Sequence, residues 1–231
     1  MKIGMISTLN TNIGDDFIRD GIQYLINKRF DKDKEFVIIN KHRPLSAVLP
    51  SVDALLGVSG RARNEILIRA GKNIGLNLKS KLDDCDIIIQ CGTPIVWHGC
   101  SKSEWAGLIW EGILEKVNKK IPVLNIAGGS CFAWTERNNV VMSDEDRCFV
   151  RLMSRISRVT TVRDSLAENI FNNISGSAVK TIPCTAFLAA SLYKKDIRQE
   201  SIEKVHVDVL FNYMPGGGHF DLEGLKLASL W

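Results

Sequence analysis

Short apolar runs alternate with longer amphipathic stretches along the chain. Continuous apolar segments at residues 2–6, 36–40, 86–92, 122–129, 158–162 and 178–182 predict strands. Stretches with apolar residues at helical spacing lie between them, at 15–28, 61–82, 103–117, 144–156 and 164–173. Because the strand segments are apolar throughout, they predict a parallel sheet covered by helices on both faces. The fold class is therefore α/β, with a doubly wound parallel sheet.

The pattern changes after residue 192. Residues 193–204 are charged and weakly patterned, as in an interdomain linker. A fresh apolar strand then begins at residue 205 and ends in a Gly-rich turn before His219. This predicts a first domain at 1–192, a linker at 193–204, and the start of a second domain at 205–231. The alternative is a final strand that adds to the first sheet.

Composition and charge change this picture little. The chain has 231 residues, 45% apolar and 24% charged, with a net charge of +4 and an isoelectric point of about 8.7. The positive excess is scattered, so it mildly favours anionic small molecules or membrane surfaces and does not indicate nucleic acid. The sequence shows no signal-peptide pattern and no apolar run of the roughly 18 residues that span a bilayer.

Six cysteines follow no repeated spacing, and several lie inside or beside apolar strand segments. They are therefore expected to be buried, reduced thiols of a cytoplasmic protein. They are Cys85, Cys91, Cys100, Cys131, Cys148 and Cys184. His98 lies between two of them, but the spacing Cys-x6-His-x-Cys fits no common zinc site, and no metal is predicted.

The residues that follow the predicted strands are the first candidates for a binding site. On a parallel sheet, ligands bind beyond the carboxyl ends of the strands. Glycines, short polar side chains and one arginine follow four of the strands there. They are Asn12, Gly14 and Asp15 after the first strand, Gly92 and Thr93 after the third, Gly128, Gly129 and Ser130 after the fourth, and Arg163 and Asp164 after the fifth.

Two interpretations fit the first of these turns. Asn12 can cap the next helix, with Asp15 in its first turn, and this needs no ligand. Alternatively, Asp15 orients a hydroxyl group or takes a proton from it. Two adjacent carboxylates disfavour a pyrophosphate there. The motif GxGxxG is absent and the second strand ends in Asn40 and Lys41, which together disfavour NAD.

Arg163 could form a bidentate pair with a carboxylate or a phosphate, or only a surface pair with Asp164.

Of Trp97, Trp105 and Trp110, core packing is expected for two. Trp97, followed by His98, could stack on a sugar ring. His219, after three glycines, could donate a proton.

Four blocks together resemble the polysaccharide pyruvyl transferase family. They are NIGDDFIRDGI (12–22), DIIIQCGTP (86–94), VTTVRDSLAENIF (159–171) and TIPCTAFLA (181–189), and VLFNYMPGGGH (209–219) is similar to the first strand of that family's second domain. The resemblance implies facing Rossmann-like halves, as in two-domain glycosyltransferases of the GT-B type. This chain would supply the first half.

The resemblance also implies an activity. Family members transfer a pyruvyl group from phosphoenolpyruvate to a sugar of a cell-surface polysaccharide, with no cofactor. Arg163 would then belong to a clamp on the donor, and Asn12, Gly14 and Asp15 would line the acceptor side. The partners would be phosphoenolpyruvate and a sugar or lipid-linked saccharide. A membrane-peripheral location and a homo-oligomer stay open.

The chain departs from the family in one respect. The family's second domain carries an Arg-x-His block that supplies the expected acid, and no such block follows residue 190 here. We therefore expect this chain to be catalytically incomplete by itself. The alternatives are a two-domain glycosyltransferase and a non-catalytic sugar-binding half-protein.

Overall fold

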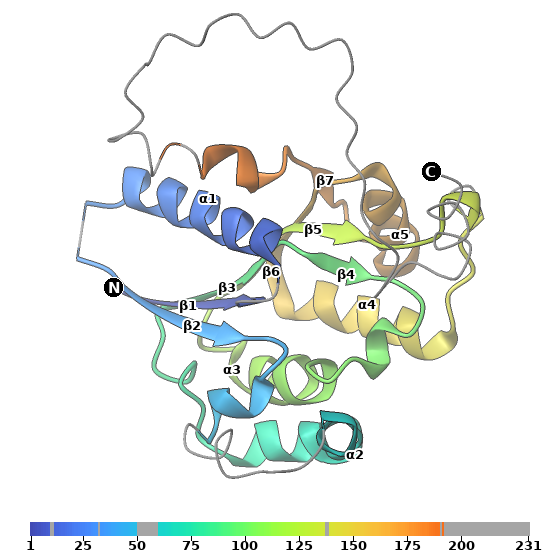
Figure 1. Cartoon of the computed structure of the whole chain (residues 1–231), viewed down its shortest axis with the longest axis horizontal. Helices are drawn as coiled ribbons and strands as arrows, with labels where there is room; N and C mark the ends of the chain where they lie inside the picture. The colour runs from blue at the N-terminus through green and yellow to red at the C-terminus, as the bar shows by residue number, and fades with distance from the viewer. Residues whose placement is uncertain (10–11, 32, 50–59, 137–138, 190, 192–231) are drawn as a thin grey trace, which may run out of the picture.

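The structure, a computed structural model, describes residues 1–9, 12–31, 33–49, 60–136, 139–189 and 191. His219, the predicted linker and the predicted second domain lie outside these residues. Within the described residues, parallel strands form one sheet in the order β2-β1-β3-β5-β6-β7, and β4 pairs with the end of β5 (Figure 1). The strands are β1 (Lys2–Ser7), β2 (Glu35–Asn40), β3 (Ile87–Cys91), β4 (Pro94–Val96), β5 (Val123–Ser130), β6 (Ser157–Val162) and β7 (Lys180–Thr181).

Helices cover the sheet from both sides. On one face lie α1 (Ile13–Arg29) and the short 3-10 helix η6 (Thr185–Leu188), while the other α-helices and a π-helix occupy the opposite face (Figure 1). These are α2 (Gly60–Asn77), the π-helix η4 (Ala106–Leu114) that continues as α3 (Glu115–Val117), α4 (Asp144–Ile156) and α5 (Ser165–Ser175). The prediction of an α/β, Rossmann-like, doubly wound parallel sheet is confirmed.

The helix boundaries follow from short polar side chains in the sequence. Asn12, Ser143 and Asp164 each accept a hydrogen bond from a backbone N–H in the first turn of α1, α4 and α5. Gly176 ends α5 in the left-handed conformation, with φ of 68°. These caps satisfy backbone groups that the helices cannot satisfy internally.

Two apolar clusters lie on the two faces of the sheet. Ile3 and Met5 of β1 pack toward α1 with Ile18 and Ile22, whereas Ile6 packs toward the larger cluster on the other face. Alternate residues of a strand point to opposite faces, so a strand buried on both sides must be apolar at nearly every position.

Glycines let α2 and η4 approach closely. A Cβ on Gly75 would lie 2.4 Å from the carbonyl oxygen of Leu108 and 2.8 Å from Cα of Gly112. Gly71 faces the backbone of Leu108 in the same way. The two glycines that interrupt the apolar pattern of α2 are therefore contact points between helices.

One helix was predicted too long, and one strand was missed. The helix predicted at 61–82 ends at Asn77, because Ser80 and Asp83 close a turn through their side chains. The strand β4 was not predicted. It exists because Gly92 and Thr93 adopt left-handed conformations and redirect the chain along the end of β5.

The cysteines are free thiols, but they are not all buried as predicted. Cys85, Cys91 and Cys100 are buried, and burial raises the pKa of Cys85 to about 11 and that of Cys100 to about 12. Cys148 is exposed on α4, and the remaining two are partly exposed. Core packing of two tryptophans is confirmed, since Trp105 and Trp110 are 1% and 0% exposed.

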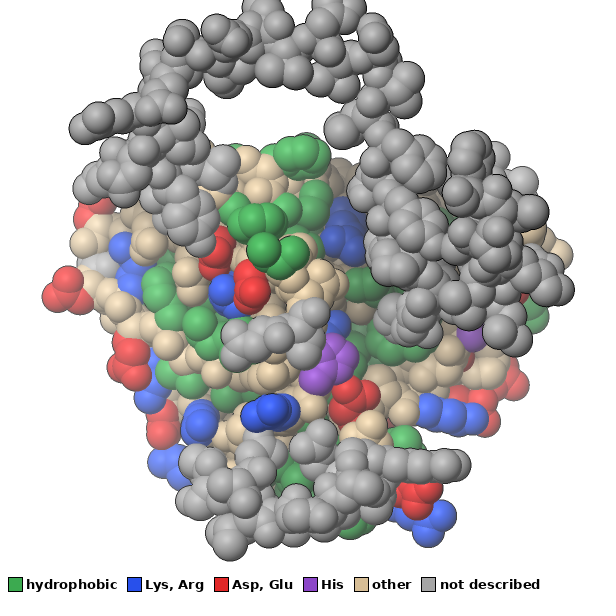
Figure 2. Space-filling model, in the orientation of Figure 1, with side chains coloured by type: hydrophobic (Ala, Val, Ile, Leu, Met, Phe, Trp, Pro, Cys, Tyr) green, Lys and Arg blue, Asp and Glu red, His purple; other side chains and the backbone are tan. Residues whose placement is uncertain are grey.

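The surface carries both apolar and charged regions. Figure 2 shows apolar side chains near the upper edge of this face, and a histidine with acidic and basic side chains near its centre. The exposed large apolar residues of α1 and η6 include Ile13, Phe17 and Phe187. No helix in the described part of the chain is long and apolar enough to span a membrane.

Candidate functional site

A cavity of about 370 Å³ lies at the carboxyl ends of the central strands. β1 lies between β2 and β3, so the strand order reverses there, and this is where open parallel sheets bind ligands. The cavity is lined by residues that follow β1, β2 and β3, together with the loop before η4. They are Thr8, Asn12, Asp15, Lys41, His42, Pro94, Trp97, Gly99, Lys102, Ser103, Glu104 and Trp105.

The turn after β1 contributes Asn12 and Asp15 to this cavity. The Asn12 side-chain oxygen accepts a hydrogen bond from Gly14 N at 3.0 Å, so the predicted capping role is confirmed. Asp15 is only 5% exposed and faces the cavity from the first turn of α1. Within the described residues, no hydrogen bond or ion pair involves its carboxylate. Asn12 thus makes the cap, while Asp15 presents its carboxylate to the cavity.

Lys41, which sequence reasoning did not select, is the main cation of the cavity. It directly follows β2 and is 5% exposed. Its Nζ donates a hydrogen bond to Oγ1 of Thr93 at 2.7 Å and lies 5.5 Å from the ring centre of Trp105. A buried lysine in contact with a neutral hydroxyl and an aromatic ring keeps an unneutralised charge.

The surroundings of Lys41 alter its acidity. The pKa of Lys41 is lowered from 10.5 to about 8. Burial is the main cause and the nearby charge of Arg163 adds to it, while the charges of Asp15 and Glu104 offset part of the effect. Asp15, Lys41 and Glu104 line the cavity, whereas Arg163 acts on Lys41 through its charge without being part of the lining. The sequence places Lys41 directly after an apolar strand at the ligand-binding edge, but this position does not predict its burial.

A histidine and a glutamate form a pair at the rim of the cavity. Nδ1 of His42 lies 2.5 Å from Oε1 of Glu104, with side-chain exposures of 44% and 20%. Burial tends to raise the pKa of Glu104, but the hydrogen bond with His42 and the charge of Lys41 bring it below its ordinary value. Glu104 thus stays ionised and holds the imidazole beside Lys41.

The turn after β3 has a strained backbone. Gly92 and Thr93 have φ of 49° and 66°, and positive φ is unfavourable for a β-branched residue such as threonine. A Cβ on Gly92 would also lie 2.3 Å from the Ile18 side chain. The turn is held by a hydrogen bond from Gly129 N to the Thr93 carbonyl oxygen at 2.8 Å. In this backbone conformation the Thr93 hydroxyl accepts the hydrogen bond from Lys41 Nζ.

Gly128 and Gly129 allow side chains to lie directly on the end of β5. A Cβ on Gly128 would be 2.2 Å from Ile95, and one on Gly129 would be 2.5 Å from Nε of Arg163. The Arg163 guanidinium rests on Gly129, and no hydrogen bond or ion pair of this side chain exists among the described residues. The predicted Arg163–Asp164 surface pair is therefore not formed.

Ser130 and Asp164 lie close together because they hydrogen-bond to each other. Asp164 accepts hydrogen bonds from Ser130 N at 2.8 Å, from Ser130 Oγ at 2.7 Å and from Ala167 N at 2.8 Å. These bonds tie the end of β5 to the start of α5. This geometry supports a positioning role for both residues, and neither of them lines the cavity.

The loop between β4 and η4 is anchored from α4. Asp146 is 2% exposed and accepts hydrogen bonds from Gly99 N, Ser101 N and Ser101 Oγ at 2.7–2.9 Å. Trp97, at the start of this loop, lines the cavity, whereas His98 pairs with Glu136 away from it. Asp146 was not selected from the sequence, because its partners lie about 45 residues earlier.

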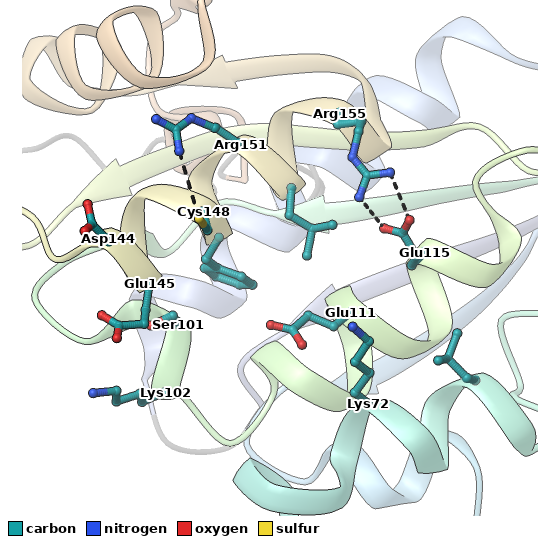
Figure 3. A pocket seen from close by; sticks show the side chains of 13 residues that line it. Lys72, Ser101, Lys102, Glu111, Glu115, Asp144, Glu145, Cys148, Arg151 and Arg155 are labelled. Atoms are coloured by element: carbon teal, nitrogen blue, oxygen red, sulfur yellow. Dashed lines mark hydrogen bonds and ion pairs between the residues drawn. The ribbon is translucent and has the colours of Figure 1, made fainter.

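A larger hollow lies elsewhere on the described surface. It measures about 970 Å³ and runs between α4 and η4 (Figure 3). Among its charged side chains, Arg155 pairs with Glu115 at 2.9 Å and Arg151 contacts Cys148. No group of three His, Cys, Asp or Glu side chains suited to a metal occurs in the described residues. The strand-end cavity is the better candidate, since it contains the unneutralised lysine.

Two of the family-like blocks pack directly on one another beside this cavity. A Cβ on Gly21 would lie 1.8 Å from the carbonyl oxygen of Thr185, and Thr185 Oγ1 donates a hydrogen bond to the Ile18 carbonyl oxygen at 3.0 Å. The blocks at 12–22 and 181–189 therefore need each other for packing. Their sequence likeness has a structural reason as well as a functional one.

The sheet and its strand-end cavity define a Rossmann-like α/β protein with a candidate ligand cavity at the point where the strand order reverses. A family model described as polysaccharide pyruvyl transferase matches residues 12–228. The chain belongs to the polysaccharide pyruvyl transferase family, which makes it a member of a transferase family and confirms the resemblance seen in the sequence. Comparison with curated proteins and with solved structures gave no match.

Proposed function

We propose that this protein transfers a pyruvyl group from phosphoenolpyruvate to a sugar of a cell-surface polysaccharide. The observation that carries this proposal is one cavity in which the carboxylate of Asp15 and the ammonium of Lys41 share the lining, with Arg163 close enough for its charge to act on Lys41. Phosphoenolpyruvate is a small ligand with a carboxylate and a phosphate, and it needs cationic partners. A sugar hydroxyl that attacks it needs an acceptor for its proton.

The reaction balances without a cofactor. Two sugar hydroxyl groups add to C2 of phosphoenolpyruvate, and the bond from C2 to the phosphate oxygen breaks. One hydroxyl proton ends on C3, which becomes a methyl group, and the other ends on the released phosphate. The products are a cyclic ketal and inorganic phosphate.

The two catalytic roles follow from charge and position. Asp15 takes the proton of the attacking hydroxyl, since it is buried, faces the cavity and has no competing partner among the described residues. Arg163 binds the donor through its planar guanidinium, which matches a carboxylate in a bidentate manner. Asn12 and Trp97 line the acceptor side, where an amide and an aromatic ring suit a sugar.

Phosphate release tests the proposal, and robust turnover by the chain alone would overturn the expectation that it is catalytically incomplete. The full chain is incubated with phosphoenolpyruvate and a panel of free and lipid-linked saccharides, and the ketal product is identified by mass spectrometry. Asp15→Asn should lower turnover by about 100-fold or more. Asp16→Asn is the matched control, because Asp16 carries the same charge one residue away and pairs with Arg19 at 2.6 Å. Binding of a nucleotide-sugar without binding of phosphoenolpyruvate would overturn the proposal.

A further inference from the structure

Lys41 has no counter-charge of its own in the described structure. Its Nζ is held by Thr93 Oγ1 at 2.7 Å and by the face of Trp105 at 5.5 Å, and no described carboxylate lies within 4.0 Å of it. A buried cation without a paired anion is costly, and folds retain such groups chiefly at functional sites. The cavity of about 370 Å³ in front of Lys41 has room for the missing anion.

We propose that Lys41, oriented by Thr93, binds the phosphate group of a small ligand in this cavity. A lysine ammonium is a compact charge that suits the several oxygens of a phosphate, whereas the planar guanidinium of Arg163 suits a carboxylate. The two cations would then bind the two ends of one ligand. The inference deepens the proposed function and rests on it only for the identity of that ligand, phosphoenolpyruvate.

The charges around Lys41 determine how binding depends on pH. Asp15 from α1 and Glu104 from the loop before η4 attract the protonated form, Arg163 from the end of β6 repels it, and His42 is held by Glu104 at the rim. The resulting pKa of about 8 means that Lys41 loses its charge just above neutral pH in the free protein. A bound anion favours the charged form, so anion affinity should fall as the pH rises above about 8.

Binding of inorganic phosphate to the full chain tests the site without reference to activity. Titration calorimetry should show that Lys41→Met weakens phosphate binding by about 10- to 150-fold, the usual loss for a charge-assisted contact. Lys120→Met is the matched control, because Lys120 is exposed at the opposite, amino end of β5 and its removal changes the net charge equally. Equal phosphate affinity in the wild-type and Lys41→Met proteins, or no phosphate binding by either, overturns the proposal.

Two further binding experiments test whether Lys41 binds the phosphate group and whether its charge causes the pH dependence. Pyruvate, which has the carboxylate without the phosphate, should lose affinity on Arg163→Ala and not on Lys41→Met, and the reverse result overturns the assignment. Sulfate keeps a constant charge across this pH range, so its affinity should fall above about pH 8 in the wild type and stay level in Lys41→Arg. If inorganic phosphate binding depends on Lys41 while a nucleotide-sugar binds and phosphoenolpyruvate does not, the phosphate site stands and the proposed function fails.

Discussion

Replacing Lys41 by methionine is expected to stabilise the folded chain. Burial lowers the pKa of Lys41 from 10.5 to about 8. Since one pKa unit corresponds to about 1.36 kcal/mol, the charged side chain opposes folding at neutral pH by about 3 kcal/mol. Methionine removes this charge at similar length, and the lost hydrogen bond to Thr93 costs about 1 kcal/mol. The net gain in the free energy of unfolding is therefore about 2 kcal/mol near pH 7.

The dependence on pH gives the sharper test of this reasoning. The folded protein releases the Lys41 proton at a lower pH than the unfolded chain does, so between pH 8 and 10.5 the unfolded state binds more protons. The free energy of unfolding contributed by Lys41 should thus rise across this window, with the full penalty present below about pH 8. Urea unfolding followed by tryptophan fluorescence measures the difference between wild type and Lys41→Met at several pH values. A variant that is less stable than wild type at pH 7, with the same pH profile, would refute the burial of an unneutralised charge.

Four other substitutions test particular contacts. Gly129→Ala should displace the Arg163 guanidinium, which would lie 2.5 Å from the new Cβ, and weaken phosphoenolpyruvate binding while leaving circular dichroism unchanged. Arg163→Ala should weaken that binding by about 1.5–3 kcal/mol in calorimetry, and unchanged affinity would remove this residue from the site. Asp146→Ala should lower the free energy of unfolding by about 2–3 kcal/mol, because it leaves buried N–H groups without an acceptor. Gly75→Ala should cost about 1–3 kcal/mol or more in urea unfolding, since its Cβ would meet the Leu108 carbonyl oxygen at 2.4 Å, and a neutral result would contradict the close helix packing.

Part of the site was predictable from the order of residues. Asp15 and Asn12 follow an apolar strand and open a helix, and parallel strands end at one edge, so their place in the cavity could be inferred. The same rule selected Ser130 and Asp164, but those two side chains bond to each other and position β5 against α5. Position after a strand thus predicts nearness to the site, and it does not distinguish a ligand-binding side chain from a supporting one.

Lys41 shows why the remainder could not be predicted. Its position in the sequence is that of any lysine after a strand, and most such lysines extend into solvent. Its burial depends on Thr93, which is 52 residues away, and on the left-handed turn that places the Thr93 hydroxyl beside Nζ. A contact of this kind is set by strand order and backbone conformation, and neither leaves a local pattern.

The sequence by itself determined the parallel α/β sheet, the helix caps and the edge at which a ligand would bind. These depend on apolar periodicity and short-range hydrogen bonds, which act between residues close in the chain. The tertiary structure alone decided which of the edge residues share a cavity and which charge there lacks a partner. Burial and electrostatic neutralisation depend on distances between segments far apart in sequence, and only the folded chain sets those distances.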